Sequence, residues 1–287
     1  MNNKIIINLV SPCATFEASL LNEACQNIIN YNYEIALNTC ARNSLPKFLN
    51  GTKLERIQEL VNAEVNFCDA MWCVRGGVGA LELIANYLPP VQKKILIGFS
   101  DATILHLHRF LFDERIGIHA DVLFSIKNKQ PEHEMLKLLI TKNYHQINYP
   151  LLNNLSFNTQ ESVSGTLLVM NLSSLQTMIG SVGIDFFKDK ILAIEDNNLK
   201  HYQFFRMFQQ FKNIGVLEQI SALILGHVDY DRQEIINETI LPLSYEHNFM
   251  FFDWPYFGHA SPNLPLLFGA PITLTHSSDN AYTLTYL

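Results

Sequence analysis

The chain has 287 residues and a mass of 32.8 kDa, with 48% hydrophobic residues, 16% charged residues and a formal net charge of −7. Soluble domains carry roughly 25% charged residues. The deficit is concentrated in residues 143–184, where Glu161 is the single charged residue, and in residues 254–278, which have none. An acidic chain without a basic cluster is a poor candidate for nucleic-acid binding. The charge-free run 162–184 is long enough to span a bilayer, but its Ser, Thr, Asn and Gly content is too polar for hydrocarbon.

The N-terminal apolar run, residues 5–10, is shorter than the apolar region of a signal peptide. The five cysteines are odd in number and lack the paired spacing of zinc sites. We therefore expect a cytoplasmic protein that binds no metal and no membrane.

Hydrophobic periodicity predicts alternating strands and helices through the first half of the chain. The expected strands are 5–10, 34–37, 70–74 and 94–98, and the expected helices are 16–31, 54–67, 80–88 and 102–112. This alternation is typical of a parallel sheet with helices on both faces, and ligands of such sheets bind beyond the carboxyl ends of the strands. Two strand ends are therefore of interest, at residues 75–79 and 98–101.

The second half predicts helices at 172–179, 201–211 and 233–241, strands at 190–194 and 222–225, and short β-patterns near 251, 272 and 282. The Asn-rich segment 143–160 has no clear period and indicates a crossover. The predicted fold class is α/β. An N-terminal three-layer domain with a mostly parallel sheet (1–142) would be joined by a linker (143–164) to a smaller C-terminal α/β domain with additional β-strands (165–287).

The glycine loop at 75–79 follows a predicted strand and precedes a predicted helix, as a dinucleotide-binding loop does. The full dinucleotide pattern requires Gly or Ala at position 82, where this chain has Glu82. A turn with functional backbone N–H groups is compatible with this sequence, whereas NAD binding is disfavoured.

Ser100 stands between an apolar strand and a helix, where a serine hydroxyl can be presented above a sheet. The generic nucleophile pattern G-x-S-x-G fails, because Ala102 occupies its last position. The alternative is that Ser100 or Asp101 is only a helix N-cap. Cys73, just before the glycine loop, is a further candidate nucleophile, although a buried thiol is more often a small hydrophobic residue.

His119, His227 and His259 each lie at or near a strand end or in a loop, where catalytic groups concentrate. Glu195 follows four apolar residues, so its carboxylate needs a partner, and an imidazolium is one. Residue chemistry alone thus indicates a possible Ser–His–Glu set without pairing its members.

Several short motifs in order resemble the LD-carboxypeptidase family of serine peptidases, which includes muramoyltetrapeptide carboxypeptidases and the microcin C immunity peptidases. Arg75-Gly76-Gly77-Val78-Gly79 is similar to the family's Arg-Gly-Gly-Tyr-Gly loop, and Gly98-Phe99-Ser100-Asp101 to its Gly-Tyr-Ser-Asp turn. Asn171-Leu172-Ser173, Ile194-Glu195-Asp196 and Gly258-His259 match further elements. The resemblance covers roughly residues 5 to 275.

The resemblance implies a serine carboxypeptidase of two domains that uses no cofactor. Ser100 would be the nucleophile, His259 its base and Glu195 the residue that orients the base. The backbone N–H groups of Gly77 and Asp101 would form the oxyanion hole. The substrate-pocket candidates are Arg75, Gly76 and Asn171.

The reaction that the resemblance implies removes the terminal D-alanine of murein tetrapeptides at the bond to diaminopimelate, in cytoplasmic cell-wall recycling. The partner would be a muropeptide or a related small peptide, and the assembly a homodimer. Departures from the family pattern are Val78 in place of Tyr, Val169-Met170 in place of Gly-Gly and Ala120-Asp121 in place of Gly-Pro. They leave two alternatives open: cleavage of another peptidyl or aminoacyl amide, and muropeptide binding without catalysis.

Overall fold

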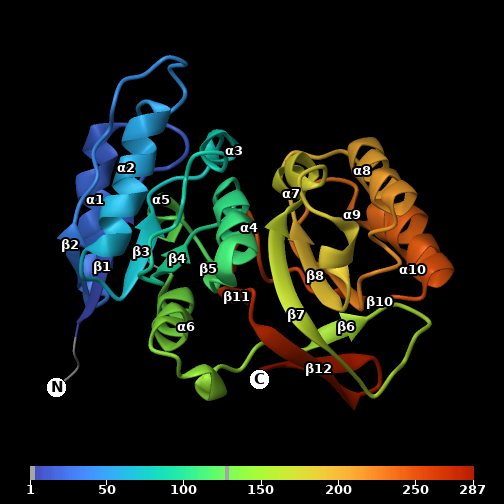
Figure 1. Cartoon of the computed structure of the whole chain (residues 1–287). Helices are drawn as coiled ribbons and strands as arrows, with labels where there is room; N and C mark the ends of the chain where they lie inside the picture. The colour runs from blue at the N-terminus through green and yellow to red at the C-terminus, as the bar shows by residue number, and fades with distance from the viewer. Residues whose placement is uncertain (1–3, 127–128) are drawn as a thin grey trace. The chain divides into compact units, whose positions relative to one another are not determined.

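The computed structural model describes residues 4–126 and 129–287 (Figure 1). The chain divides into two compact units, Met1–Asn143 with Pro265–Phe268, and Tyr144–Leu264 with Gly269–Leu287. The second unit is nearly as long as the first, and neither is one continuous stretch of chain.

The first unit contains a six-stranded sheet in the order β11-β5-β4-β3-β1-β2, in which β1 to β5 are parallel and β11 is antiparallel to β5. The strands are β1 (Ile5–Val10), β2 (Tyr33–Leu37), β3 (Ala70–Cys73), β4 (Ile95–Ile97), β5 (Gly117–His119) and β11 (Leu266–Phe268). The helices are α1 (Ala18–Asn30), α2 (Lys53–Val65), α3 (Ala80–Leu83), α4 (Ala102–Asp113), α5 (Leu123–Ile126) and α6 (Gln130–Ile140).

This α/β architecture with a mostly parallel sheet confirms the predicted fold class. The sheet grows from β1 to β2 in one direction and from β1 through β3, β4 and β5 in the other. The direction of winding therefore changes between β1 and β3, which is where open α/β sheets form their ligand crevice. The loops that follow β1, β3 and β4 all leave the sheet at the carboxyl ends of these strands.

The second unit contains seven strands in a closed barrel of order β10-β6-β13-β12-β7-β8-β9. The strands are β6 (Leu152–Asn154), β7 (Ser162–Asn171), β8 (Lys190–Glu195), β9 (Ala222–Leu225), β10 (Met250–Asp253), β12 (Pro271–Ser278) and β13 (Ala281–Tyr286). The helical segments are η1 (Tyr144–Gln146), α7 (Leu172–Met178), η2 (Ile184–Phe187), α8 (His201–Ile214), α9 (Arg232–Glu234), the π-helical η3 (Ile235–Ile240) and α10 (Leu241–His247). Strands β7 to β10 are parallel, and antiparallel strands close the barrel.

The following three segments differ from the sequence-based expectation. Residues 144–164, expected to be a linker, belong to the second unit and contain η1, β6 and the first residues of β7. The helix expected at 80–88 ends at Leu83. Strand β7 was not predicted because its pattern changes along its length: its first half is partly exposed opposite β12, and its last five residues are buried beside β8.

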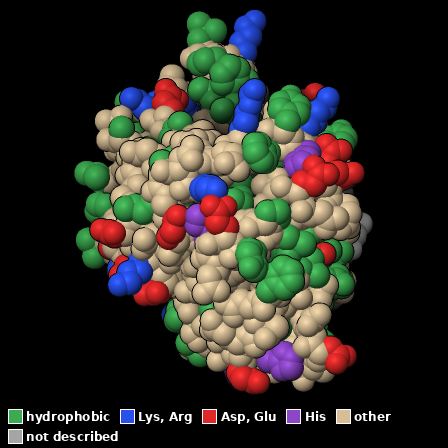
Figure 2. Space-filling model, turned by 90° about the vertical axis from the view of Figure 1, so that its right-hand side faces the viewer, with side chains coloured by type: hydrophobic (Ala, Val, Ile, Leu, Met, Phe, Trp, Pro, Cys, Tyr) green, Lys and Arg blue, Asp and Glu red, His purple; other side chains and the backbone are tan. Residues whose placement is uncertain are grey.

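The described part of the chain contains no helix that is long and apolar enough to cross a membrane. On the face shown in Figure 2, acidic, basic and histidine side chains occur in small groups among a largely uncharged surface. This distribution matches the low content of charged residues.

Candidate active site

Ser100 lies in a strand–turn–helix connection between β4 and α4, with a backbone φ of 58°. A non-glycine residue in this left-handed region is uncommon and strained, and such strain is typical of nucleophile turns. Thr103 holds the turn in place, because its backbone N–H and its hydroxyl both donate to the Ser100 carbonyl, at 3.0 and 2.7 Å. Thr103, the second residue of α4, therefore stabilises the turn.

The glycine loop after β3 lies directly against Ser100. A Cβ atom at Gly76 would lie 2.9 Å from the Ser100 Cβ and 3.2 Å from its Oγ, so position 76 has no room for a side chain. Gly77 has a φ of 99°, and a Cβ there would lie 2.7 Å from the Ala14 Cβ. Both glycines are therefore required for the loop to approach the serine turn.

The two predicted oxyanion-hole donors are the backbone N–H groups of Gly77 and Asp101. Within residues 4–126 and 129–287, neither group donates a hydrogen bond to another part of the chain. Gly77 is exposed, and Asp101 directly follows the serine. Both donors are therefore unused by the fold itself, as a site for a developing oxyanion requires.

The Asp101 carboxylate has a role that sequence reasoning missed. Its Oδ2 accepts the backbone N–H of Ala80, the first residue of α3, at 2.7 Å. Burial raises the pKa of this carboxyl above its ordinary value of 3.8, opposed by hydrogen bonds from Ala80 and the Cys13 thiol and by the charge of Arg56. An acid directly after a nucleophile would ordinarily cap its own helix, but Asp101 makes no side-chain cap on α4. It connects the serine turn to the end of the glycine loop instead.

Arg56 is a second residue that sequence reasoning missed. Its side chain is fully buried, and Nη1 donates to the carbonyls of Pro12 at 2.8 Å and Gly79 at 2.9 Å. The same guanidinium pairs with Glu82. The carboxylate that argued against dinucleotide binding is thus the ion-pair partner of an arginine that fixes the loops after β1 and β3.

Arg75 is the exposed cation of the glycine loop. Its Nη1 donates to the Thr15 carbonyl at 2.7 Å. Among the described residues, no carboxylate forms an ion pair with it. An exposed guanidinium without such an ion pair suits binding of a substrate carboxylate.

The thiol of Cys73 is fully buried, and burial raises its pKa far above the ordinary value. A thiol in this environment stays protonated and inert. The geometry therefore argues against Cys73 as the nucleophile.

In the second unit, Glu195 and His259 form a hydrogen-bonded pair. The Nδ1 atom of His259 lies 2.6 Å from Oε2 of Glu195, which is the last residue of β8. The side chain of Glu195 is 0% exposed and that of His259 is 20% exposed. With Nδ1–H donating to the carboxylate, the imidazole is held in the tautomer whose Nε2 carries the basic lone pair.

The loop that carries His259 is shaped to fit against Glu195. Gly258 has a φ of 112°, and a Cβ there would lie 2.7 Å from the Glu195 Cβ. Its N–H donates to Oδ1 of the fully buried Asn263 at 2.8 Å, which closes the loop. Glycine at position 258 therefore allows the imidazole to approach the end of β8.

The other candidate histidines have different surroundings. His227 lies near the pair, and burial lowers its pKa despite the nearby Asp229. His119 belongs to the first unit, where it is fully buried with its ring 5.9 Å from that of Phe99. Of the three candidate histidines, His259 is the one whose hydrogen bond to a carboxylate is observed.

Asn171, predicted for the substrate pocket, is 5% exposed, and its Oδ1 caps α7 by accepting the Ser174 N–H at 3.0 Å. Asp196 supports the same helix start by accepting the Ser173 N–H at 2.7 Å. Asn171 is also the register partner of Glu195 in the β7–β8 pair. In this structure, its side-chain oxygen positions α7 beside the carboxylate.

No group of three or more His, Cys, Asp or Glu residues that could hold a metal ion occurs in the described ranges. A strained serine between a strand and a helix, together with a histidine–carboxylate pair, belongs to the chemistry of serine hydrolases. Sequence comparison gives the family. The LD-carboxypeptidase N-terminal domain matches residues 7–118, and the LD-carboxypeptidase C-terminal domain matches residues 164–274.

Relatives match over most of the chain. A Rickettsia conorii protein, named only as an inferred carboxypeptidase, is 29% identical over 96% of this chain and 89% of its own length. A Bacillus subtilis protein, whose name as a murein peptide carboxypeptidase is itself inferred, is 23% identical over 78% of this chain and 72% of its own length.

Solved structures share the fold. Muramoyltetrapeptide carboxypeptidase from Oxalobacter formigenes superposes with a TM-score of 0.77 at 20% identity, covering 98% of each chain. The microcin C7 self-immunity protein MccF, solved with aspartyl sulfamoyl adenosine, gives 0.79 at 18% identity, covering 100% of this chain and 97% of its own. The chain belongs to the LD-carboxypeptidase family and is a serine-type carboxypeptidase, as the sequence motifs predicted.

Proposed function

We propose that this protein is an LD-carboxypeptidase that hydrolyses the diaminopimelate–D-alanine bond of murein tetrapeptides through a Ser100–His259–Glu195 triad. The observation that carries the proposal is the hydrogen bond of 2.6 Å between His259 and the buried Glu195. A buried carboxylate paired to a partly exposed imidazole is the arrangement that orients a general base.

In this mechanism, Nε2 of His259 takes the proton of the Ser100 hydroxyl as Oγ attacks the scissile carbonyl. The Glu195 carboxylate stabilises the imidazolium, which returns the proton to the leaving amine of D-alanine. The N–H groups of Gly77 and Asp101 bind the oxyanion. Water then hydrolyses the acyl-enzyme by the same route.

The chain runs directly from the loop with His259 into a segment of the first unit. His259 precedes Pro265 by six residues, and Pro265 begins the segment that belongs to the first unit. That segment continues into β11, which pairs with β5, the neighbour of the strand that leads to Ser100. The backbone thus tethers the loop with the base to the unit with the nucleophile.

Substrate binding requires a cation for the terminal carboxylate of D-alanine. We assign this part to Arg75, because its guanidinium is exposed beside the serine turn and is paired only with a backbone carbonyl among the described residues. Gly76 admits the substrate chain close to Ser100 because it has no side chain.

The activity is tested by measuring D-alanine release from murein tetrapeptide. Ser100→Ala should lower kcat by several orders of magnitude, as loss of a triad nucleophile does. Ser277→Ala, at an exposed position of β12, is the matched control and should keep full activity. Undiminished turnover by Ser100→Ala would refute the nucleophile assignment.

One observation supports a second candidate, the cleavage of another peptidyl or aminoacyl amide. Of the departures from the family pattern, Ala120, Asp121, Val169 and Met170 are buried, whereas Val78 is 50% exposed beside the glycine loop. Asp121 is held by an ion pair of 2.7 Å with Lys129. The substrate-facing change is therefore concentrated at Val78.

One assay distinguishes the candidate functions. The protein is offered murein tetrapeptide and, in parallel, aspartyl sulfamoyl adenosine, the compound bound in the MccF structure. Faster cleavage of the second compound would favour the immunity-type activity. Calorimetric binding of tetrapeptide without turnover would favour a binding protein.

The proposal also includes a cytoplasmic role in cell-wall recycling and a homodimeric assembly.

A further inference from the structure

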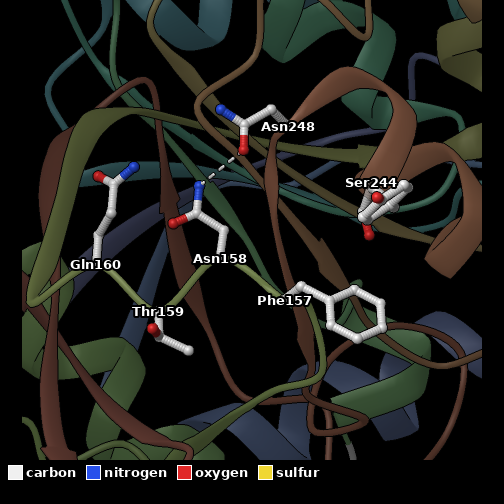
Figure 3. A pocket seen from close by; sticks show the side chains of 7 residues that line it. Phe157, Asn158, Thr159, Gln160, Ser244 and Asn248 are labelled. Atoms are coloured by element: carbon white, nitrogen blue, oxygen red, sulfur yellow. Dashed lines mark hydrogen bonds between the residues drawn. The ribbon is translucent and has the colours of Figure 1, made fainter.

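The second unit contains a surface pocket that the proposed reaction does not use. Its volume is about 520 Å³, within the ~300–1,000 Å³ of small-molecule sites. The loop before β7 forms one side of it, and the end of α10 forms the other (Figure 3). The lining residues are Phe157, Asn158, Thr159, Gln160, Ser244, Tyr245 and Asn248.

Every hydrogen-bonding side chain that lines this pocket is neutral. Asn158, Gln160 and Asn248 contribute carboxamides, and the side chains of Asn158 and Asn248 point toward each other (Figure 3). The two ionisable residues that follow Tyr245 in the chain contact other side chains, because Glu246 pairs with Lys212 at 2.6 Å and His247 Nδ1 lies 3.0 Å from Glu218. An ionic ligand would therefore find no counter-charge among the lining residues.

Two aromatic rings stand exposed at the same pocket. Phe157 is 80% exposed and Tyr245 is 74% exposed, with ring centroids 5.7 Å apart in an edge-to-face contact. Exposed apolar side chains gathered at a pocket mark interaction sites more often than single exposed residues do. The rings supply flat apolar surfaces beside groups that donate and accept hydrogen bonds.

The loop that carries Phe157 is fixed in advance by a buried amide. Asn154 is 3% exposed, and its Oδ1 accepts the N–H and the hydroxyl of Ser156 at 3.0 and 2.7 Å. Its Nδ2 donates to the Asn158 carbonyl at 2.8 Å, and the Tyr282 hydroxyl donates to the Gln160 carbonyl at 2.6 Å. A preorganised loop lowers the entropic cost of binding a ligand.

We propose that this pocket binds a neutral saccharide. Sugar hydroxyls both donate and accept hydrogen bonds, which suits carboxamides, and the C–H face of a pyranose packs on an aromatic ring. A carboxylate or phosphate would lack a cation here, and a wholly apolar ligand would leave the amides without partners. A saccharide satisfies both kinds of lining group.

The test uses the full-length protein labelled with ¹⁵N and titrated with chitobiose, cellobiose and maltose. Saturable amide shifts confined to residues 156–160 and 244–248 are expected, with a millimolar Kd for at least one sugar. Tyr245→Ala and Phe157→Ala should weaken that binding roughly tenfold, equivalent to about 1.4 kcal/mol. Tyr202→Ala, which removes a 57% exposed aromatic ring from α8, is the matched control and should bind unchanged.

Absence of saturable shifts with all three sugars overturns the proposal. Equal binding by Tyr245→Ala and the unmodified protein overturns it as well, as does tighter binding of glycylglycine amide at the same residues. Because the readout is binding, its result is independent of whether the Ser100 activity is found.

Discussion

The carboxylate of Asp101 accepts the backbone N–H of Ala80 at 2.7 Å, and this bond joins the turn that carries Ser100 to the helix that follows the glycine loop. Asp101 and Gly77 are the two residues proposed to donate to the oxyanion, and they lie on the two connected segments. A side-chain bond therefore holds the spacing between two backbone donors.

We expect Asp101→Ala to lower kcat more than Asp101→Asn does, because the asparagine carbonyl still accepts from Ala80 whereas alanine leaves that buried N–H unpaired. An unpaired buried donor costs about 1–3 kcal/mol of unfolding free energy. Steady-state kinetics with murein tetrapeptide and urea unfolding measure the two effects. Equal kcat values for the two variants would show that the Ala80 bond has no part in positioning the donors.

Glu195→Gln should lower kcat by about four orders of magnitude with little change in KM, because an amide at this place stabilises the wrong imidazole tautomer and cannot stabilise the imidazolium. A fluorophosphonate probe gives a readout independent of the substrate, since its reaction rate with Ser100 reports activation of the hydroxyl. The control is Glu34→Gln, at an exposed strand position. Unchanged probe labelling of Glu195→Gln would contradict the assignment.

His106 makes stability depend on pH. Burial lowers the pKa of this imidazole from 6.5 to about 3, although its Nε2 lies 2.9 Å from the Gly98 carbonyl. Between these pH values the unfolded chain binds a proton that the folded chain does not. The unfolding free energy therefore falls as pH is lowered from 6.5 toward 3.

His106→Gln removes this titration and keeps a donor for Gly98. Its unfolding free energy in urea should fall less steeply than that of the unmodified protein between pH 7 and pH 4. His145→Gln, at an exposed position, should leave the pH dependence unaltered. Parallel curves for His106→Gln and the unmodified protein would show that His106 does not contribute.

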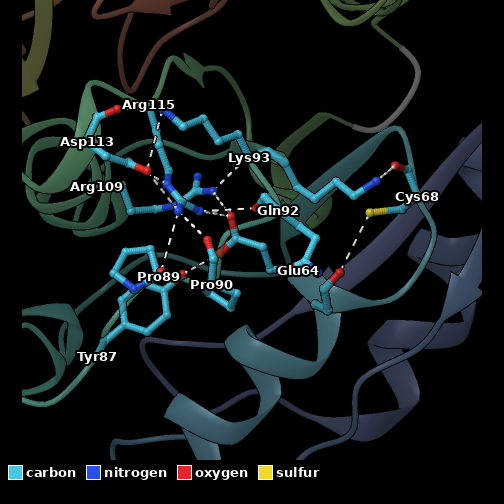
Figure 4. Close-up of polar contacts among 12 residues, drawn as sticks. Glu64, Cys68, Tyr87, Pro89, Pro90, Gln92, Lys93, Arg109, Asp113 and Arg115 are labelled. Carbon is cyan, nitrogen blue, oxygen red and sulfur yellow. Dashed lines mark hydrogen bonds and ion pairs between the residues drawn. The ribbon is translucent and has the colours of Figure 1, made fainter.

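A buried ion cluster supports the first unit away from the catalytic turn (Figure 4). The fully buried Glu64 accepts from Arg109 at 2.7 Å and from the Tyr87 hydroxyl at 2.9 Å, and it also pairs with Arg115. These groups lie on α2, α4 and the segments that precede β4 and β5. They therefore lie toward the amino ends of the strands, whereas the turn with Ser100 follows the carboxyl end of β4.

Glu64→Gln should lower the unfolding free energy by about 3–5 kcal/mol, because two buried guanidinium groups lose their shared counter-charge. Catalysis at a temperature where the variant remains folded should be unaffected. The control Glu34→Gln removes a mostly exposed partner 4.0 Å from Lys4 and should change stability by less than about 1 kcal/mol. A loss of less than about 1 kcal/mol in Glu64→Gln would show that the cluster contributes little to the unfolding free energy.

The sequence predicted the elements whose own residues form a clear apolar pattern and missed others, for physical reasons. Strands β1 and β9 match their predicted ranges because each is a run of mostly apolar residues that forms its own signal. Strands β5 and β11 have three residues each, and they are strands because of pairing with distant segments, β11 with β5 and β5 with both β11 and β4. No local period can indicate such a pairing.

The candidate site shows the same difference between local signals, which the sequence carries, and long-range contacts, which it does not. Glu195 was identified because a carboxylate after an apolar strand needs a partner, but residue chemistry did not identify which histidine, since His259 is 64 positions away. The contacts of Asp101 with Ala80 and of Arg56 with the carbonyls of Pro12 and Gly79 escaped prediction, because these partners are backbone groups of distant segments. A sequence specifies side chains directly, whereas the N–H and carbonyl groups that meet them depend on the completed fold.

Strand β11 also constrains how the molecule is made. During synthesis, the first 143 residues emerge without the strand that covers the edge of β5, and an uncovered edge is prone to pair with other chains. The ring of His106 likewise lacks its stacking partner Phe268 until β11 has been synthesised; in the folded chain the two ring centroids are 5.7 Å apart. The unit that contains Ser100 is therefore completed only after the loop with His259 has been synthesised, so a ribosome-bound fragment of the first 143 residues remains an unfinished fold.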